Sequence, residues 1–553
     1  MDRPPNTAPP AARPQPQRPP QQRQQEPPPK PIPPSLMTLD RIRLGRGPRK
    51  PGYVVPKPAE SGWSSAPSRR RDLISLCSLL ALLAVQTCLT LRLHNGASLD
   101  EALLITGGRA QLDGLPWTGT PLSGAPQIYP ALAAVLDGAG GIELVRSSSL
   151  LLMLAATSLF YFLNRRLFNE RASLCATSLL VVTQSTALIG NLATFDALAF
   201  FLLTLSLWIV VMTGKDHIWL GVAAAPVLGL AVAVKFAAAP YVFVVAAIAA
   251  LVSIPYIGRA QGMARGGALL AGALASVGLL LLATGSFEAF QEVTTAAAPG
   301  GPDSPGRMLG SFLEWGGLVL AVGILGGVFY VRRSRMGEVT VRPGAAPDPG
   351  RNWRIGLATV MCGAALIAPL YQAFLHNGTS LAKNVGFGLL FTTSMAGVGV
   401  TRMMGAHFKF PQAGILIGVL VMVFGMAQAS WNFGYWSNQK VLVEQLEPYF
   451  KSQGHYLSDA PEIASYYAGE NSDPGQWIGL NKISYRSQTG AAGYQKAIKD
   501  GYFDVVVLDR QADTPLRKLL LTALDTSDAY RPKASLAYTS ALGPSFFEVW
   551  IKR

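Results

Sequence analysis

Residues 195 to 213 read FDALAFFLLTLSLWIVVMT, with Asp196 as the one charged side chain in 19 residues. About 20 apolar residues in a helix cross the roughly 30 Å hydrocarbon core of a bilayer, so this stretch is a candidate transmembrane helix. Ten further stretches have the same character, at about 73–93, 143–163, 172–190, 217–235, 237–257, 266–284, 312–331, 354–375, 383–403 and 412–431. The sequence therefore predicts a polytopic α-helical membrane protein with about 11 transmembrane helices.

The overall composition supports the same class. Of 553 residues, 50% are hydrophobic and only 14% are charged, and the mean hydropathy is +0.28, which is too apolar for a soluble chain of this length. The net charge of +15 raises the question of a nucleic-acid partner, but the basic residues lie in the N-terminal tail and in short loops. No basic face interleaved with aromatic side chains occurs, so we expect membrane lipids and no nucleic acid as partners.

The two ends of the chain differ from the apolar middle. Residues 1–68 are dominated by Pro, Gln and Arg and predict a disordered, Pro-rich cytoplasmic tail. Residues 69–436 then form the transmembrane domain, and residues 437–553 have the composition of a small soluble α/β domain in which no catalytic motif stands out. In that domain we expect strands at 502–509 and 545–551 and helices near 460–468, 491–500 and 515–524.

The distribution of Lys and Arg among the loops predicts the orientation in the membrane, because cytoplasmic loops carry an excess of basic residues. With a cytoplasmic N-terminus, every second loop is cytoplasmic, and an odd number of spans places residues 437–553 outside. These cytoplasmic loops carry Arg165, Arg166, Arg171, Lys215, Arg259, Arg265, Arg332, Arg333, Arg335, Arg342, Arg351, Arg354, Arg402 and Lys409. The outer loops hold little beyond Arg109, Lys235, Arg307 and Lys383. The high usage of Ala, Gly, Pro and Arg is typical of a bacterial protein, so we expect a multi-pass protein of a bacterial plasma membrane.

The first outer loop, residues 94–142, is too long for a simple hairpin. It contains an amphipathic stretch at 99–109 and a second interfacial piece at 128–136, separated by a turn-rich segment at 115–121. Both pieces predict helices that lie along the outer membrane face, and the first brings the adjacent acids Asp100 and Glu101 there. The alternative is that these two carboxylates only form the solvated face of an interfacial helix.

Several charged residues at the outer ends of the predicted spans are candidate site residues. A carboxylate at membrane depth, such as Asp196, costs a few kcal/mol and faces a cavity or a partner; the alternative is a helix cap at the interface. Lys235 opposes the charge bias of outer loops and suits an anionic ligand such as a lipid phosphate, or it snorkels to head groups. Lys383, shortly after His376, has the same status, and Arg146 either binds a ligand or anchors its helix.

These features resemble the GT-C superfamily of lipid-linked-sugar glycosyltransferases, including the protein O-mannosyltransferases and the aminoarabinose transferases of lipid A. The resemblance covers about residues 73–553 and begins with Ser98-Leu99-Asp100-Glu101-Ala102 after the first span. It continues with Tyr129-Pro130, Val145-Arg146, Arg165-Arg166-Leu167-Phe168, Phe195-Asp196 and the stretch from Gly229 to Lys235. The resemblance implies a GT-C-like membrane fold with interfacial helices in the first outer loop.

The resemblance also implies a reaction, the transfer of a hexosyl or pentosyl group from a polyprenyl-phosphate sugar donor at the extracytoplasmic face. The acceptor would be a hydroxyl of a cell-envelope glycan, lipid or protein. Asp100 is the candidate general base, and Glu101 and Asp196 would orient the acceptor or the sugar. The substrate-binding candidates are Lys235, Arg146 and Lys383 for the phosphate, with Tyr129 and His376 beside them. No cofactor is expected, and no metal is assigned because the first outer loop lacks a DxD motif.

Two other functions remain open at this point. A lipid-linked glycan transporter or flippase would move its substrate without chemistry, and such proteins often show inverted repeats and interrupted helices. The sequence shows no such internal symmetry. A non-catalytic envelope assembly protein would instead use the C-terminal domain to bind cell-envelope components.

Overall fold

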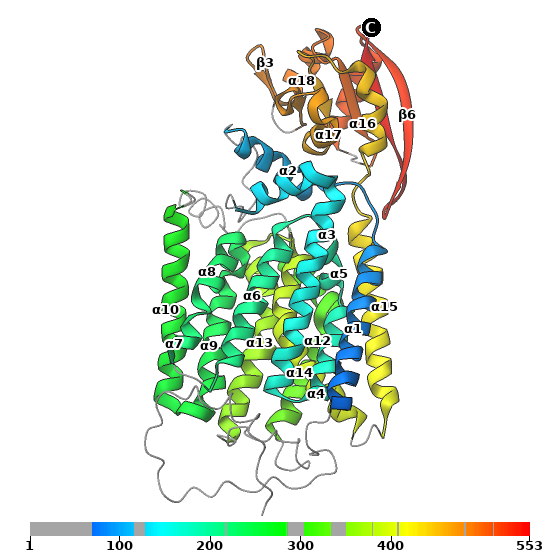
Figure 1. Ribbon diagram of the computed structural model, residues 1–553. Coiled ribbons are helices and arrows are strands. Elements are labelled where there is room, and N and C mark those ends of the chain that lie inside the picture. Colours follow the sequence, from blue (N-terminus) through cyan, green and yellow to red (C-terminus); the bar gives the residue numbers. More distant parts are fainter. Residues whose placement is uncertain are drawn as a thin grey trace, which may run out of the picture. The chain divides into compact units, whose positions relative to one another are not determined.

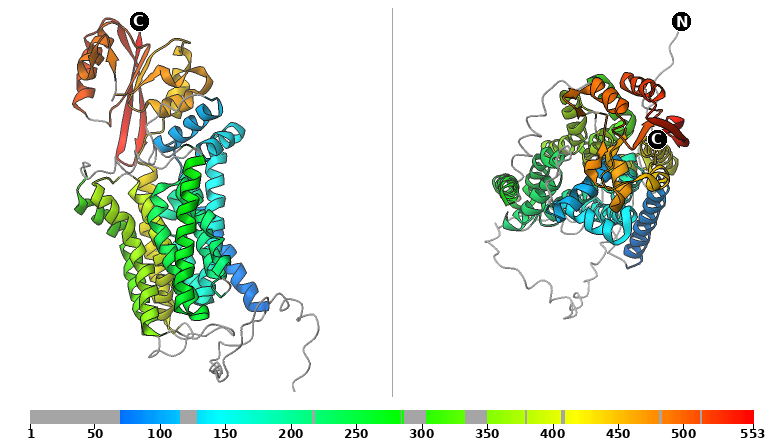
Figure 2. Two further views of the ribbon diagram at one scale, coloured as in Figure 1. Left: turned by 90° about the vertical axis from the view of Figure 1, so that its left-hand side faces the viewer. Right: turned by 90° about the horizontal axis from the view of Figure 1, so that it is seen from above.

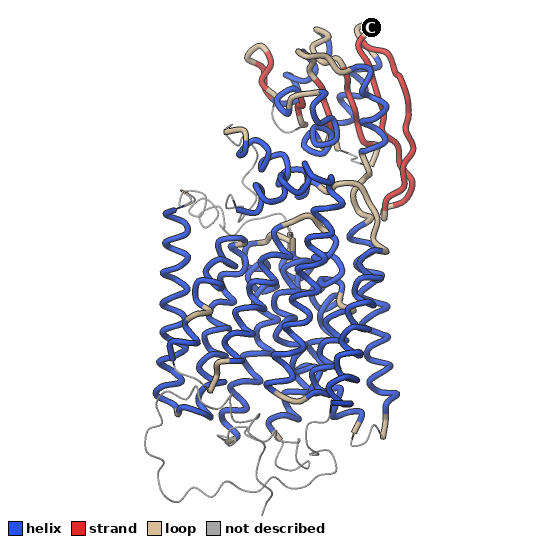
Figure 3. The backbone as a smooth tube through the Cα atoms, viewed as in Figure 1, coloured by secondary structure: helices blue, strands red, loops and turns tan. Residues whose placement is uncertain are grey.

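The computed structural model describes residues 69–114, 128–215, 218–283, 285, 303–332, 350–378, 380–405, 409–480, 483–511 and 514–553. The Pro-rich tail predicted at 1–68 and the turn-rich segment at 115–121 lie outside the described residues. Figure 1 shows long helices running side by side, and in Figure 2 the same helices are seen end-on from above. In Figure 3 the strands are confined to the C-terminal part of the chain.

The described residues up to Phe433 are mostly helical. In order, they are α1 (Arg69–Leu91), α2 (Leu99–Leu112), α3 (Ile128–Leu167), α4 (Glu170–Val181), α5 (Gln184–Asn191), α6 (Phe195–Met212), α7 (Ile218–Val222), α8 (Ala225–Val234), α9 (Ala239–Ile257), α10 (Arg259–Ala283), α12 (Pro305–Val331), α13 (Arg351–Leu375), α14 (Leu381–Met404) and α15 (Pro411–Phe433). Each of the eleven predicted apolar stretches is thus mostly helical within its described residues, and the polytopic helical class is confirmed.

The number of membrane crossings stays a prediction. Within the described ranges, eight helices are long and apolar enough to cross a membrane, or nine if α4 and α5, which meet at a 62° bend, form one span. Helices α7 and α8 divide another predicted span into two short pieces. Helix α14 is not among the eight, and its residues 385–400 are all buried. A helix enclosed by other helices needs no apolar stripe toward lipid.

The predicted interfacial pieces are both helical. The first is α2, and the second forms the start of α3, where the backbone leaves helical geometry at Gly140 and Gly141. Gly141 has a φ of 68°, a left-handed conformation that favours glycine. This break separates the outer part of α3 from the apolar part that follows, so the expected boundary near residue 142 has a local cause in the two glycines.

The C-terminal part is a small α/β domain, as predicted. Its five-stranded sheet has the order β2-β1-β5-β7-β6; β1 is parallel to β2 and β5, and β7 is antiparallel to β5 and β6. The two expected strands occur as β5 and β7, and the three expected helices occur as α17, α18 and α19. The elements are α16 (Lys440–Leu446), β1 (Tyr456–Ser458), α17 (Pro461–Ala468), β2 (Trp477–Ile478), β3 (Ser484–Tyr485), β4 (Gln488–Thr489), α18 (Gly490–Lys499), β5 (Val505–Asp509), α19 (Pro515–Asp525), β6 (Tyr530–Ser540) and β7 (Gly543–Lys552).

Two hydrophobic clusters stabilise this sheet, one on each face. Successive residues of a strand point to opposite faces. In β5, Val505 and Val507 belong to one cluster, and Val506 and Leu508 belong to the other. A continuous apolar run in β5 is therefore the expected sequence of a strand covered on both sides.

Candidate functional site

Helix α2 begins at a capping box that fixes its first turn. The Ser98 hydroxyl accepts a hydrogen bond from the Glu101 amide at 3.4 Å, and the Glu101 carboxylate accepts one from the Ser98 amide at 2.8 Å. Such a reciprocal pair satisfies amides that a helix start otherwise leaves without partners. Asp100 and Glu101 both lie in this first turn, where the helix dipole favours negative charge.

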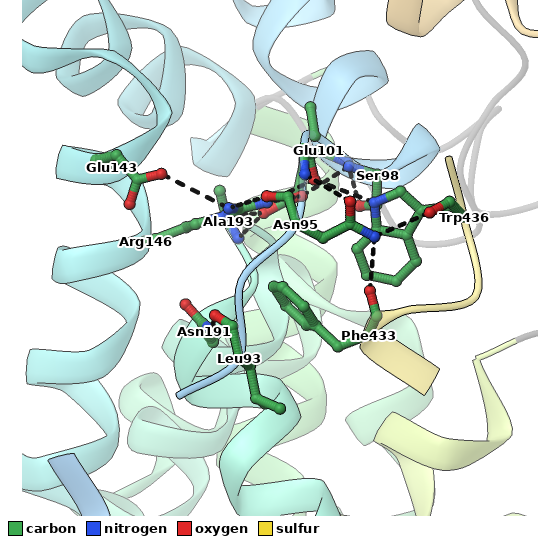
Figure 4. Close-up of polar contacts among 12 residues, drawn as sticks. Leu93, Asn95, Ser98, Glu101, Glu143, Arg146, Asn191, Ala193, Phe433 and Trp436 are labelled. Carbon is green, nitrogen blue, oxygen red and sulfur yellow. Dashed lines mark hydrogen bonds and ion pairs between the residues drawn. The ribbon is translucent and has the colours of Figure 1, made fainter. Parts of the chain in front are cut away.

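Glu101 forms a buried ion pair with Arg146 of α3 (Figure 4). The guanidinium donates two hydrogen bonds of 2.9 Å, one to each carboxylate oxygen. The Ala193 amide, just before α6, donates a third at 2.7 Å. Glu101 is fully buried, and with the capping bond from Ser98 its oxygens are occupied by partners from α2, α3 and the start of α6. A bidentate Arg–carboxylate pair of this kind is strongly directional.

Arg146 also holds the segment that connects α1 to α2. Its guanidinium donates to the backbone carbonyls of Asn95 at 2.9 Å and Gly96 at 3.0 Å. The Asn95 amide group donates to the carbonyls of Phe433 and Trp436, and the Trp436 indole donates to Gly96 (Figure 4). The Glu101–Arg146 pair therefore has a structural role, which is to fix where α2 begins.

Four further charges form a continuous row, although they come from four separate segments: α2, α6, the residue that follows α8, and α14. The Lys383 ammonium lies 2.6 Å from a carboxylate oxygen of Asp100 and 3.6 Å from one of Asp196. Asp196 also pairs with Lys235. The order is therefore Asp100, Lys383, Asp196, Lys235, with alternating signs and no net charge. We call these four residues the charge row.

Access to the charge row differs sharply from end to end. The Asp100 side chain is 32% exposed, whereas those of Lys383, Asp196 and Lys235 are 10%, 0% and 4% exposed. Burying an isolated charge would cost far more than this fold could tolerate, which is why each buried member has an opposite charge beside it. A molecule from outside the protein would meet Asp100 first and Lys383 behind it.

Aromatic rings surround the inner end of the charge row. The Lys235 ammonium lies 5.5 Å from the centre of the Phe195 ring and 5.1 Å from that of Phe387, within the range of cation–π attraction. The ring of Tyr129, a buried residue, contacts Phe195 edge-on at 6.3 Å. The Thr194 hydroxyl donates to Asp196 at 2.7 Å. Tyr129 therefore lies near the predicted charges, and its role as a substrate contact stays a prediction.

His376 lies in the turn between α13 and α14 that leads to Lys383. His376 and Ser380 both have positive φ, 55° and 61°, conformations that cost non-glycine residues energy and often occur near functional sites. The His376 carbonyl accepts a hydrogen bond from the Asp303 amide. Among the described residues, no hydrogen bond or ion pair links the His376 side chain to the charge row.

The eight predicted site residues thus fall into groups. Asp100, Asp196, Lys235 and Lys383 form the charge row; Glu101 and Arg146 form the adjacent structural pair; Tyr129 is near, and His376 is not joined to them. Sequence reasoning assigned no role to Thr194 or to Ser98, although each is a Thr or Ser directly before a helix, a pattern that predicts an N-cap. Within the described ranges, no three His, Cys, Asp or Glu side chains gather as metal ligands would.

Solved structures with a similar fold are known, although no protein-family model matches the chain and no curated protein sequence matches it. ArnT from Cupriavidus metallidurans in the apo state aligns over 87% of this chain and 98% of its own, with a TM-score of 0.53 and 12% identity. The apo oligosaccharyltransferase of Archaeoglobus fulgidus aligns over 87% of this chain and 75% of its own, with a TM-score of 0.52 and 13% identity. Both are GT-C superfamily members. This chain has a GT-C-like fold.

A second ArnT structure, bound to undecaprenyl phosphate, aligns with a TM-score of 0.51 and 12% identity, again over 87% of this chain and 98% of its own. At such low identity, these alignments establish the GT-C-like fold and leave the reaction to be argued from the residues. The resemblance that the sequence motifs predicted is therefore confirmed at the level of the fold.

Proposed function

We propose that this GT-C-like protein is a membrane glycosyltransferase that uses a lipid-phosphate sugar donor. The observation that carries the proposal is the contact between the partly exposed Asp100 carboxylate and the Lys383 ammonium, 2.6 Å apart at the accessible end of the charge row. A carboxylate that accepts a proton and a cation that binds a phosphate are the two groups that this transfer needs. They lie side by side where a substrate could reach both.

In the proposed reaction, Asp100 takes the proton of an acceptor hydroxyl as its oxygen forms a bond to the anomeric carbon of the sugar. The bond between that carbon and the phosphate oxygen breaks, and its electron pair stays on the polyprenyl phosphate. Lys383, backed by Lys235, stabilises the negative charge that develops there. Attack from the face opposite the phosphate would invert the anomeric centre, as the family resemblance implies.

Lys383 has to serve two partners in this scheme. Before a donor binds, the charge row is neutral, with two carboxylates and two ammonium groups. A donor phosphate adds negative charge, and we propose that Lys383 turns from Asp100 toward it while Asp196 keeps the ammonium anchored. Asp100 then loses a hydrogen bond to its charged form, which makes it a better proton acceptor. Arrival of the donor would thus prepare the base.

The other predicted residues take supporting roles in the proposal. Glu101 and Arg146 position Asp100 by fixing the first turn of α2. Asp196 holds the two lysines together. Tyr129 and His376 remain candidates for contacts with the sugar or the acceptor.

The solved GT-C structures support the class of substrate. One ArnT structure contains undecaprenyl phosphate. A further A. fulgidus oligosaccharyltransferase structure has a tethered acceptor peptide; it aligns over 86% of this chain and 74% of its own, with a TM-score of 0.50 and 13% identity. For this chain we propose a polyprenyl-phosphate sugar as donor and a hydroxyl of a cell-envelope glycan, lipid or protein as acceptor. The proposed location is the extracytoplasmic face of a bacterial plasma membrane, with the N-terminus cytoplasmic and the C-terminal domain outside.

The direct test uses the full chain in liposomes with labelled polyprenyl-phosphate arabinose, mannose and aminoarabinose as donors and a cell-envelope extract as acceptor. Asp100→Asn should lower turnover by about 10²- to 10⁴-fold, the usual contribution of a general base. Asp113→Asn is the matched control, because Asp113 is an exposed carboxylate at the other end of α2. Equal turnover of the two variants would remove Asp100 from the role.

One observation favours a second candidate, a lipid-linked glycan transporter. The bent pair α4 and α5 is an interrupted helix, and transporters often bind their substrates at such breaks. The same liposome experiment separates the two functions. A transferase produces a new glycosidic product and free polyprenyl phosphate, whereas a transporter moves the labelled donor across the bilayer unchanged.

A further inference from the structure

Helix α17 of the C-terminal domain shares a hydrophobic core with the membrane domain. Its residues Ile463 and Tyr466, 4% and 8% exposed, belong to the same cluster as Ala97 and Ala102 at the start of α2 and Tyr129 of α3. The rest of the sheet domain has its own two clusters. Helix α17 therefore packs against the helices that carry the site as well as within its own domain.

Tyr467 holds the residue that leads into the capping box. The Ala97 amide donates a hydrogen bond of 2.6 Å to the Tyr467 hydroxyl. The backbone at Gly96 also lies close to this domain: a Cβ added to Gly96 would lie 3.1 Å from the Tyr467 hydroxyl and 2.5 Å from the Asn438 side chain. Ala97 is fully buried, so its amide would have no water to replace a lost partner.

Tyr466 holds the other end of α2. Its hydroxyl donates a hydrogen bond of 2.8 Å to Asp137, and Asp137 pairs with Arg109 in the last turn of α2. The Arg109 guanidinium also lies 5.5 Å from the centre of the Tyr466 ring. Burial raises the pKa of both Tyr466 and Tyr467, so both stay protonated near neutral pH.

The contacts of these adjacent tyrosines lie at opposite ends of α2, and Asp100 lies in its first turn. We infer that Tyr466 and Tyr467 are positioning residues, through which the C-terminal domain sets the place of Asp100 relative to Lys383. The inference rests on the proposed function, since it assigns the two tyrosines an effect on the base. A displacement of a catalytic group by about 1 Å can cost about 10²-fold in rate, so a small loosening of α2 would be measurable.

The test compares Tyr467→Phe and Tyr466→Phe with Tyr494→Phe in the full chain in liposomes. Tyr494 is the matched control, because it is a buried tyrosine of the same domain whose hydroxyl donates to a backbone carbonyl, that of Gly479, at 2.5 Å. Two quantities are measured: turnover with the labelled donors, and hydrogen exchange of the backbone amides at 97–104. The second needs no substrate.

We expect faster exchange at 97–104 and a roughly 10- to 10²-fold lower kcat in Tyr467→Phe, with KM for the donor changed less than about two-fold. Tyr466→Phe should act in the same direction, and Tyr494→Phe should change neither quantity at α2. Equal losses of turnover in all three variants would mean that the tyrosines only stabilise the domain, and this would overturn the inference. Unchanged hydrogen exchange at 97–104 in Tyr467→Phe would also overturn it. Faster exchange in a protein whose wild type transfers no sugar would instead contradict the proposed function alone.

Discussion

Lys383 reaches Asp100 across 283 positions of the sequence, with its ammonium 2.6 Å from the carboxylate, and it also lies 3.6 Å from Asp196. One cation therefore joins the interfacial helix α2 to the buried start of α6. The Asp100 side chain is 32% exposed and Lys383 is its ion-pair partner. The accessible end of the charge row thus combines a carboxylate and a cation within one hydrogen bond.

Replacing Lys383 with methionine should weaken the binding of undecaprenyl phosphate by about ten- to a hundred-fold, because a hydrogen bond to a charged group contributes about 1.5–3 kcal/mol. Asp196 keeps Lys235 as its partner in this variant, so we expect the protein to remain folded. Titration of the purified protein with undecaprenyl phosphate measures the change. Lys440→Met, at an exposed lysine of α16, is the control, and phosphatidylglycerol as competitor shows whether any anionic lipid suffices. Unchanged binding in Lys383→Met would place the phosphate elsewhere.

Asp196→Asn should destabilise the protein by about 3–5 kcal/mol, because it leaves the Lys235 ammonium buried without its counter-charge. Adding Lys235→Met removes the orphaned charge, so the double variant should recover most of that loss while remaining inactive in sugar transfer. Thermal unfolding in detergent reports the stability, and the liposome assay reports the activity. If the double variant recovered both stability and sugar transfer, the Asp196–Lys235 pair would serve folding alone.

Glu101→Gln and Asp100→Asn should behave in opposite ways although the residues are neighbours. Glu101 is fully buried against Arg146, so its neutralisation should cost about 3–5 kcal/mol of unfolding free energy. Asp100 is partly exposed, so its loss should cost about 1 kcal/mol or less, while turnover collapses. Denaturation curves of the two variants provide the comparison. A fully stable Glu101→Gln variant would contradict the structural role assigned to Glu101.

Asp459 should make the C-terminal domain less stable as pH rises from about 4 to 6. Burial, followed by the nearby charge of Asp509, raises the pKa of Asp459 to about 6, above the ordinary value of about 3.9. The folded domain therefore holds this proton more tightly than the unfolded chain, and the resulting stabilisation, about 3 kcal/mol, is lost as pH rises through the folded pKa.

Asp459→Asn should remove that pH dependence, and hydrogen exchange at residues 505–509 between pH 4 and 7 measures it. Exchange rates are first corrected for their intrinsic dependence on pH. Asp525→Asn, at an exposed acid closing α19, is the control and should retain the wild-type trend. A trend that persists in Asp459→Asn would assign it to another group.

The helices and strands were largely predictable from local sequence, because lipid and a two-sided core impose simple patterns. Long apolar runs predicted the described helices of the membrane domain. The continuous apolar run in β5 predicted a strand covered on both faces. The interruptions were not predictable in the same way. Residues 217–235 form one apolar stretch by composition, yet α7 and α8 are separate helices, since apolarity alone does not fix the course of the backbone.

Among the site residues, the sequence by itself determined which charges are unusual, because a carboxylate or an ammonium group next to an apolar run is costly wherever the chain folds. It identified Asp196, Lys235 and Lys383 on that ground, whereas Asp100 was identified through the acidic pair of the amphipathic stretch and the family resemblance. Only the tertiary structure decided how they are paired: adjacent acids in α2 face different partners, since side chains at successive positions of a helix point about 100° apart. Glu101 turns to Arg146 and becomes structural, whereas Asp100 turns to Lys383 and stays accessible. Burial and the partner across the bundle decide between the two roles, and neither is encoded in the neighbouring residues of the chain.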